Sequence, residues 1–282
     1  MTGASACFIV NDSLVKYASE TMPAAQLIFI RGVVATVLVL AVAKATGATR
    51  HLREIGRGWV AIRAVVDSIA TMLFLVSLFH LPLANATAIN MLSPLLIAVL
   101  AALFLRERLD AARWIAIGIG FAGVLFVIQP RSEHFNGYAL VCFLSSLLIA
   151  VRDLVTRRVH TRVPSILITL SNTVAVMLLA GMLSLFGGWR AFSAFEVGLL
   201  AVAAVFLATA YYLIVVSTRQ GDLSLTAPFR YTALLFATVS GFVVWGEVPN
   251  ALAWAGIVLV IAPGIYILRV SRRARAAPIT PD

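Results

Sequence analysis

Charged residues are scarce in this 282-residue chain, at 12% of the total. A soluble domain usually carries about 25% charged residues, because its surface must be hydrated. Hydrophobic residues make up 61% of the chain, and apolar runs long enough to cross the roughly 30 Å core of a bilayer recur along it. The scarcity of charge therefore excludes a soluble fold and predicts a polytopic membrane protein, with the lipid bilayer as its surroundings.

Cysteine and clustered metal ligands are also lacking. Cys7 and Cys142 both lie inside apolar runs, so we expect neither a disulfide framework nor a cysteine-based metal site. The glycine pattern at 118–123 matches a dinucleotide fingerprint, but it lies in an apolar helix without a preceding strand, so it indicates helix packing. The histidines stand at span ends or in loops without metal spacing: His51, His80, His134 and His160. We expect no metal and no cofactor.

Acidic residues are fewer than basic ones, 12 against 22, which gives a formal net charge of +10. Such an excess can indicate a nucleic-acid partner. Here the basic residues are scattered through short loops between apolar runs, with no dense patch and no soluble domain. The excess is therefore better explained by the enrichment of Lys and Arg in cytoplasmic loops, and we expect no nucleic-acid partner.

The apolar segments predict an all-α integral membrane fold. An open sheet cannot satisfy its backbone in lipid, and the runs are too long for the strands of a barrel. We expect ten transmembrane helices, at residues 3–18, 25–43, 58–79, 84–105, 111–128, 137–151, 164–185, 195–216, 225–245 and 251–270.

The loop charges predict the orientation of these helices. With the N-terminus inside, the outer loops hold only Arg131 and Arg190. The inner loops then hold sixteen basic residues: Lys44, Arg50, Arg53, Arg57, Arg106, Arg108, Arg113, Arg152, Arg157, Arg158, Arg162, Arg219, Arg269, Arg272, Arg273 and Arg275. This asymmetry predicts a protein of the cytoplasmic (inner) membrane with both termini in the cytoplasm.

The chain also contains an internal repeat, because residues 83–122 match residues 223–262 at an offset of 140 without a gap. The identical pairs are Leu83/Leu223, Leu95/Leu235, Val99/Val239, Glu107/Glu247, Ala111/Ala251, Trp114/Trp254, Ile117/Ile257 and Ala122/Ala262. We therefore expect a first repeat at 1–130, a second at 136–272 and a cytoplasmic basic and proline-containing tail at 273–282. Five helices per repeat is an odd number, so the second repeat must be inverted, an arrangement that suits alternating access.

The same offset places Met1 opposite Val141, several residues into the sixth expected helix. The first helix would then be about one turn short, roughly 5 Å at 1.5 Å per residue. We expect a true start upstream rather than a bilayer that is thinned locally, although both explanations stay open.

Residues 84–127 combine a small-residue helix containing Ser93-Pro94, a glutamate after the fourth span (Glu107), Trp114 and a glycine-rich fifth span. This stretch resembles the end of an EamA-type repeat of the drug/metabolite transporter superfamily, and Leu223–Leu268 resembles a second copy. The polar stretch at 11–16 resembles that of the family's first helix. The resemblance implies a ten-helix carrier whose central cavity is lined mainly by helices 1, 3, 4, 6, 8 and 9. Members of the superfamily move amino acids, vitamins, nucleotide-like metabolites and drugs.

Ionisable side chains inside the bilayer cost roughly 2.5–3.5 kcal/mol each on insertion scales, so each needs a reason. Asp12 and Lys16 are four residues apart, as are Arg63 and Asp67, and opposite charges can pair at this spacing. Two interpretations stay open for these pairs. They are either neutralised pairs that pack the bundle, or gates or proton-coupling pairs that break in one state.

Arg31 and Arg230 lack an opposite charge one turn away on their own helices. For Arg31 we expect Asp12 as the partner, in a role that is structural or in contact with cargo. Arg230 follows Pro228, which can free carbonyls for a ligand, so it is our candidate for contact with cargo; a position near the cytoplasmic edge is the alternative. Asn90, Ser93 and Pro94 occupy the matching depth of the first repeat, where helix packing is an equal explanation.

These observations predict a secondary carrier of a small organic metabolite that works by alternating access, and not an enzyme. An unpaired arginine favours a carboxylate-bearing cargo such as an amino acid. The alternatives are uptake of a riboflavin-like vitamin or a nucleotide-like metabolite and, from another class, a membrane enzyme or scaffold. Transport direction, coupling and oligomeric state stay open, a monomer included.

Overall fold

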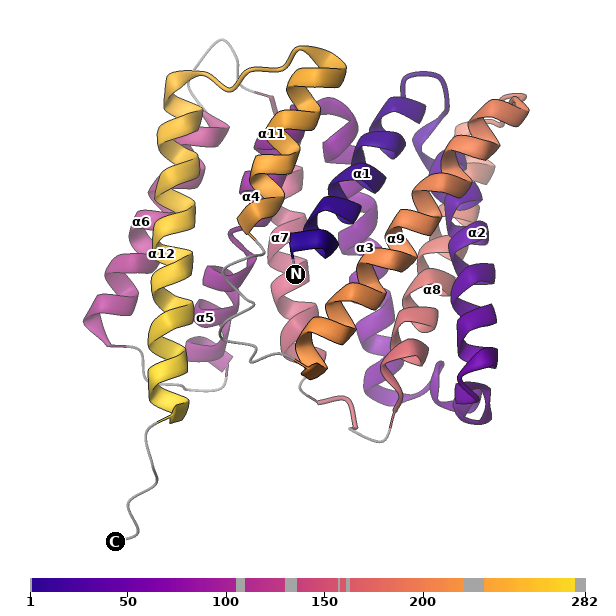
Figure 1. Cartoon of the computed structure of the whole chain (residues 1–282), viewed down its shortest axis with the longest axis horizontal. Helices are drawn as coiled ribbons and strands as arrows, with labels where there is room; N and C mark the ends of the chain where they lie inside the picture. Colours follow the sequence, from indigo (N-terminus) through magenta and orange to yellow (C-terminus); the bar gives the residue numbers. More distant parts are fainter. Residues whose placement is uncertain are drawn as a thin grey trace, which may run out of the picture.

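The computed structural model describes residues 2–104, 110–129, 136–156, 158–160, 163–220 and 231–276 (Figure 1). Within these residues the chain forms helices and no strand. The elements are α1 (Thr2–Ala18), α2 (Ala24–Ala45), the 3₁₀ helix η1 (Ala48–Glu54), α3 (Gly58–His80), α4 (Leu83–Asn90), α5 (Ser93–Phe104), α6 (Ala111–Ile128), α7 (Tyr138–Thr156), α8 (Ser165–Gly187), α9 (Ala194–Gln220), α11 (Thr232–Trp245) and α12 (Ala251–Ala276).

Seven helical stretches in the described part of the chain are long and apolar enough to cross a membrane, with α4 and α5 together forming one of them. Two shorter apolar helices, α11 and the first part of α12, add to these. Large apolar side chains such as Leu185, Phe186 and Val243 are exposed on the outside of the bundle. An apolar exterior of this kind is suited to lipid, so the prediction of an integral membrane protein is confirmed.

Several predicted spans agree with the structure to within two residues, namely those of α2, α3, α6 and α8. The span predicted at 84–105 is instead broken into α4 and α5. Pro94 has no N–H to donate to the carbonyl of Asn90 four residues earlier, and the Ser93 hydroxyl donates to that carbonyl at 2.6 Å instead. The break is therefore a consequence of the proline, with the neighbouring serine satisfying the carbonyl that the proline leaves free.

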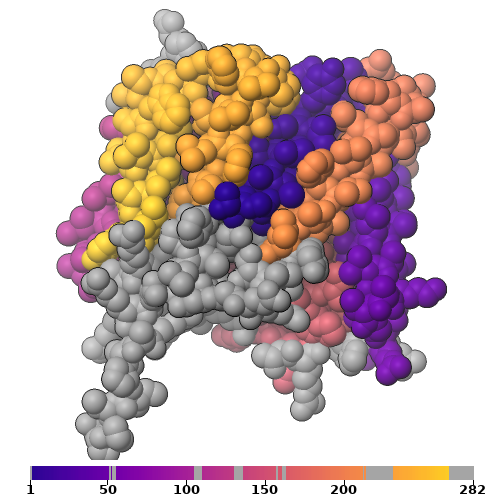
Figure 2. All heavy atoms as spheres, viewed as in Figure 1, coloured from indigo at the N-terminus to yellow at the C-terminus, as the bar shows by residue number. Residues whose placement is uncertain are grey.

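The two halves of the chain are interleaved rather than separate. In Figure 1, α2, α8 and α9 lie at one side of the molecule and α6 and α12 at the other. Helix α1 packs against α9 and α11, α2 against α8 and α9, α3 against α7 and α8, and α6 against α12. Figure 2 shows α1 between α11 and α9 on one face. Most of the interior is therefore an interface between the first half and the second.

The contact between α6 and α12 is close enough to require glycine. A Cβ on Gly123 would lie 2.8 Å from the carbonyl oxygen of Gly256, and one on Gly118 would meet nothing within 4 Å. Gly123 belongs to the dinucleotide-like pattern in the sequence, and no strand precedes that pattern within the described residues. The interpretation of this glycine as a helix-packing residue is confirmed.

Candidate functional site

Lys16 ties the first half of the chain to the second half at one end of the bundle. Its ammonium group donates to Glu247 Oε1 at 2.6 Å and to the carbonyl of Leu81 at 2.7 Å. The other oxygen of Glu247 accepts from the backbone N–H of Leu83 at 2.9 Å. We call these residues, together with Trp245, the Lys16–Glu247 lock. It lies at the upper ends of α1 and α11 in Figure 1.

The expected Asp12–Lys16 pair does not form, and this prediction is corrected. Lys16 is two residues from the end of α1, where its long side chain reaches the turn between α11 and α12. Its side chain is 8% exposed, and that of Glu247 is 21% exposed. A buried ammonium needs several acceptors, and the Leu81 carbonyl and Glu247 supply them whereas Asp12 does not. Spacing along one helix therefore gave the wrong partner.

A glycine turn and an aromatic ring hold Glu247 in place. Gly246 ends α11 with φ +67°, a left-handed conformation that favours glycine, and the N–H of Glu247 then donates back to the carbonyl of Gly241 at 3.0 Å. The ring of Trp245 lies 4.7 Å from the Lys16 ammonium, and its indole N–H donates to Glu20 at 2.7 Å. The lock is thus a preorganised set of contacts between α1 and the α11–α12 turn.

Below the lock, Asn11 lies between Asp12 and Arg31. The guanidinium of Arg31 donates to Asn11 Oδ1 at 3.3 Å, and the Asn11 amide donates to Asp12 at 2.9 Å. Arg31 is 6% exposed and Asn11 is 1% exposed. Arg31 and Asp12 therefore share Asn11 as a hydrogen-bond partner, and among the described residues they form no ion pair with each other.

An aromatic pair follows further into the bundle. Phe8 of α1 packs edge-on against Tyr211 of α9, with the ring centroids 5.4 Å apart. Tyr211 interacts electrostatically with Arg31 of α2 and with charged residues of α3 and α7. The aromatic pair therefore belongs to the same polar interior as these charged side chains.

The α3–α7 cluster consists of Arg63 and Asp67 on α3 and of Arg152, Asp153 and Thr156 on α7. Arg63 lies 3.5 Å from Asp67, so the predicted pair is confirmed. Asp67 accepts a shorter bond, 2.8 Å, from Arg152, which the loop count had placed outside the helices. Helix α7 extends to Thr156, five residues beyond its predicted end, and this extension brings Arg152 into the bundle.

Arg152 also contacts Asp153 at 2.8 Å, and Arg63 donates to Thr156 at 2.9 Å. Asp67 is 3% exposed and lies between two arginines, so it neutralises part of their charge. Sequence reasoning missed Arg152 and Glu247 as functional residues. The repeat offers a signal for both, since Arg152 aligns with Asp12 and Glu247 with Glu107 at the offset of 140.

The remaining predicted site residues fall into two groups. Asn90, Ser93 and Pro94 form the break between α4 and α5, where the Ser93 hydroxyl bonds to Asn90. Pro228 and Arg230 lie outside the described residues, as does Glu107. Contact of these residues with cargo stays a prediction.

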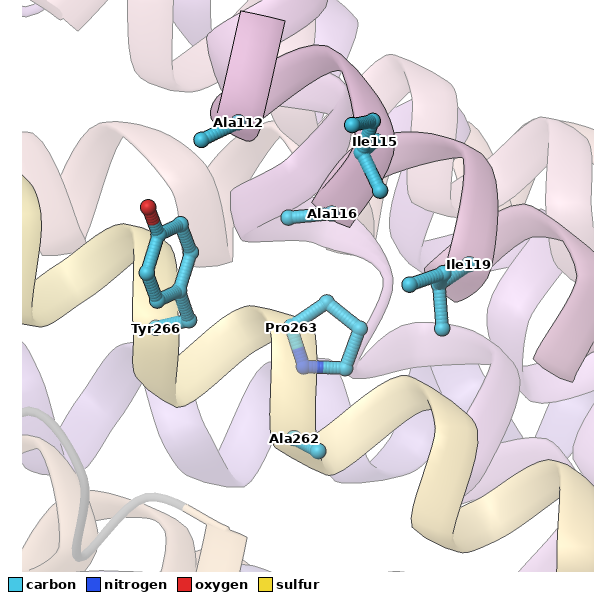
Figure 3. Close-up of a pocket in the computed structure, with 7 residues that line it drawn as sticks. All are labelled: Ala112, Ile115, Ala116, Ile119, Ala262, Pro263 and Tyr266. Atoms are coloured by element: carbon cyan, nitrogen blue, oxygen red, sulfur yellow. The ribbon is translucent and has the colours of Figure 1, made fainter.

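Two cavities differ in the polarity of their lining. One, of about 280 Å³, lies between α6 and α12 and is lined by Ala112, Ile115, Ala116, Ile119, Ala262, Pro263 and Tyr266 (Figure 3). Its only polar side-chain group is the Tyr266 hydroxyl, which does not suit recognition of a polar metabolite. The other, of about 470 Å³, lies beside the lock and includes Asn85, Asn136 and Asn250. In the described part of the chain no group of His, Cys, Asp and Glu has the arrangement of a metal site.

A bundle of membrane-spanning helices with ionisable side chains buried inside it defines a polytopic membrane protein of the transporter class, because such residues usually mark a pathway for substrates or ions. The model of the EamA-like transporter family matches residues 1–129 and 136–269. The chain belongs to this family, and it is a membrane transporter.

Curated relatives match along most of the chain. It is 27% identical to the pseudopaline exporter of Pseudomonas aeruginosa, over 95% of this chain and 94% of the relative. It is 27% identical to the riboflavin transporter of Vibrio cholerae, over 98% and 95%. Identity to the S-adenosylmethionine uptake transporter of Rickettsia bellii is 24%, over 70% and 68%.

One crystal structure of a protein with 17% sequence identity matches with a TM-score of 0.66, covering 98% of each chain, and this likeness supports the fold. The relatives are named as transporters of small metabolites, in agreement with the predicted class of function.

Proposed function

We propose that this protein is a secondary carrier of a small organic metabolite, working by alternating access between two inverted five-helix repeats. The observation that carries the proposal is the Lys16–Glu247 lock. It joins α1 of the first half to the α11–α12 turn of the second half at one end of the bundle. A contact of this kind can hold a pathway closed at that end and break when the halves move.

The pattern of helix packing supports an inverted repeat. At the offset of 140, α1 corresponds to α7, α2 to α8, α3 to α9 and α6 to α12. Exchanging the halves turns the α1–α9 contact into the α3–α7 contact, and the α2–α9 contact into the α3–α8 contact, and all four occur. Helix α11 begins at Thr232, which aligns with Leu92 in the break between α4 and α5. The start of α11 thus aligns with the break between α4 and α5.

The loop charges support the proposed orientation, with both termini in the cytoplasm and the protein in the cytoplasmic membrane. The lock then lies at the outer side, so this structure is closed toward the outside. The inner counterpart of Lys16 at the offset of 140 is Thr156, which cannot form an ion pair. We expect the two ends of the pathway to be closed by different chemistry.

For the cargo, we propose a metabolite with a carboxylate, such as an amino acid, because Arg31, Arg63 and Arg152 are all held inside the bundle. The second candidate is a vitamin or a nucleotide-like metabolite, favoured by the relatives named for riboflavin and S-adenosylmethionine and by the Phe8–Tyr211 pair. The protein would act as a carrier without enzymatic activity, without a cofactor and without a nucleic-acid partner.

A reversible cross-link across the lock tests the proposal. Lys16→Cys and Glu247→Cys would be combined in a protein whose native cysteines are replaced, and joined by a short bifunctional thiosulfonate. Counterflow of labelled L-amino acids, riboflavin and S-adenosylmethionine would be measured in liposomes. We expect the cross-link to slow counterflow of the transported compound at least about tenfold, with recovery on reduction, because the outer end could no longer open.

The matched control joins Gln129 to Asn250, which hydrogen-bond at 2.8 Å between the ends of α6 and α12. This pair lies at the same end of the bundle but in the peripheral helices. Its cross-link should leave counterflow unchanged. Equal inhibition by both cross-links, or none by the first, would contradict an outer gate at the lock.

A further inference from the structure

Arg31 keeps part of its hydrogen-bonding capacity unused although it is buried. Its guanidinium carries five N–H groups and stays charged in proteins. One nitrogen donates to Asn11, at a rather long 3.3 Å, and the Nε atom has no acceptor among the described residues. A buried charged donor without an acceptor is costly, so such a group needs an explanation, and a ligand that supplies the acceptor is one.

Asp12 also has unused hydrogen-bonding capacity, in its case as an acceptor. Its carboxylate accepts one hydrogen bond from a described residue, that of the Asn11 amide. Lys16, one turn further along α1, is engaged in the lock and leaves Asp12 without an ammonium partner. The carboxylate therefore has lone pairs available for a donor.

Asn11 bridges these two opposite charges. The attraction of a buried acid and a buried base offsets the cost of desolvation only when their contact is close and well formed. Here the fully buried amide of Asn11 bonds to both groups instead. The arrangement leaves one cationic and one anionic group, side by side, each with unused capacity.

The position of this pair suits a site on the pathway. Asp12 is six residues from the end of α1, and Arg31 is seven residues from the start of α2, so both lie roughly 10 Å along their helices from the connection between α1 and α2. Tyr211, paired with Phe8, lies within electrostatic reach of Arg31. At the offset of 140, Asn11 meets Val151 and Arg31 meets Ser171, so the second half has no copy of this group. A packing role shared by both halves therefore does not explain Asn11 and Arg31.

We propose that Asp12 and Arg31, spaced by Asn11, form a two-charge recognition site for a small zwitterion. Arg31 binds the carboxylate of the cargo, Asp12 binds its ammonium group, and the Phe8–Tyr211 pair contacts its apolar part. A cargo with only a carboxylate would leave Asp12 without a partner, and a cargo with only an amine would leave Arg31 without one. The inference rests on the proposed function, and it names the class of cargo.

Binding of three matched compounds tests this site. L-phenylalanine carries both charges, 3-phenylpropanoate only the carboxylate, and phenethylamine only the ammonium group. Thermal shifts of the purified full-length protein would give the Kd for each compound. We expect L-phenylalanine to bind at least about tenfold more tightly than either analogue, because only the zwitterion satisfies both residues.

Two variants test which residue binds which charged group of the cargo. Arg31→Gln should abolish the preference for L-phenylalanine over phenethylamine, and Asp12→Asn the preference over 3-phenylpropanoate, whereas Arg50→Gln, at an exposed position, should change neither. If Arg31 and Asp12 had only a structural role, the variants would lower stability without changing the ratios of the Kd values for the three compounds. Absence of L-phenylalanine binding, or equal binding of all three compounds, overturns the proposal.

These outcomes are separate from those of the cross-linking experiment. If the cross-link blocks counterflow but the preference for the zwitterion is absent, the proposed carrier function is supported and the proposed two-charge site is contradicted. If the preference is present but neither cross-link affects counterflow, the site stands and the proposed outer gate fails.

Discussion

Glu247 is the residue on which the lock depends, because each of its carboxylate oxygens has a different partner. One oxygen accepts from the Lys16 ammonium, and the other accepts from the backbone of Leu83. The glutamine side chain has the same shape but only one acceptor oxygen and no charge. Replacement of this single residue therefore separates the charge of the lock from its packing.

We expect Glu247→Gln to lower the free energy of unfolding by about 2 kcal/mol, since it removes a charge-assisted hydrogen bond and leaves a buried ammonium without its counter-ion. Thermal denaturation of the purified protein in detergent measures the change. Glu196→Gln is the comparison, because this half-buried carboxylate near the start of α9 accepts from Thr21 and Ser193 and has no buried ammonium as its partner, so its loss should be smaller. Similar losses for the two variants would show that the ion pair contributes nothing specific.

Asp67 has a comparable role in the α3–α7 cluster, where it separates two arginines. We expect Asp67→Asn to destabilise the protein by about 3 kcal/mol, because Arg63 and Arg152 would then lose the buried anion that both contact. The control is Asp153→Asn, whose carboxylate also contacts Arg152 but whose side chain is 33% exposed. A larger loss for Asp153→Asn than for Asp67→Asn, in the same denaturation measurement, would contradict this assignment.

At the scale of elements, α6 and α12 form a helix pair whose backbones come close together at glycines. The absence of a side chain at Gly123 lets the two backbones approach, since a Cβ there would meet both the Gly256 carbonyl and Leu259 within 3 Å. Small residues are typical of such contacts in membranes, where helices associate through packing rather than through the hydrophobic effect. This pair lies at one side of the bundle (Figure 1), and in the proposed mechanism it would be a scaffold against which the inner helices move.

We expect Gly123→Val to lower stability by about 2 kcal/mol, because valine would force α6 and α12 apart. The matched control is Gly118→Val on the same helix, where a Cβ meets nothing within 4 Å. Melting temperatures of the two variants in one detergent provide the comparison. An equal loss for both variants would indicate that valine acts through the helix itself and not through the contact.

At the scale of the whole molecule, the described helices lie side by side, with the lock at one end of the bundle and the 3₁₀ helix η1 at the other (Figure 1). The proposed orientation places Arg190 outside and Arg50 inside. In a cysteine-free background, we expect Arg190→Cys to react with a membrane-impermeant maleimide in intact cells. Arg50→Cys should react only after permeabilisation, because its loop would be cytoplasmic. The opposite labelling pattern would invert the topology and place the lock at the inner side.

Much of the fold could be predicted from local properties of the sequence. The spans of α2, α3, α6 and α8 follow from apolar runs of bilayer length, and this signal needs no knowledge of the neighbouring helices. The break at Met91–Leu92 was not predicted as a break, although Ser93-Pro94 was noted, because a proline inside a membrane helix can also be tolerated. The end of α7 was placed five residues too early, since Arg152 and Asp153 look like loop residues until their partners on α3 are known.

The charged residues show the limit of prediction from sequence more clearly. Spacing along one helix correctly predicted Arg63 with Asp67, which share α3. The same rule failed for Asp12 and Lys16, because Lys16 finds Glu247, 231 residues away, and Asp12 finds Asn11. A rule about neighbours on one helix takes no account of partners on other helices. The Lys16 ammonium has such partners, since it donates to Glu247 and to the backbone carbonyl of Leu81.

The sequence by itself determined that this chain crosses a membrane many times and that it resembles EamA-type transporters, and it carries a repeated residue pattern at an offset of 140. These properties depend on the length, order and charge of segments, which the chain carries locally. Only the tertiary structure decided which charges meet: Lys16 with Glu247, Asp67 with two arginines, and Arg31 with an asparagine in place of an acid. The physical reason is that the partner of a buried charge is whichever group the packing of separate helices brings within about 3 Å.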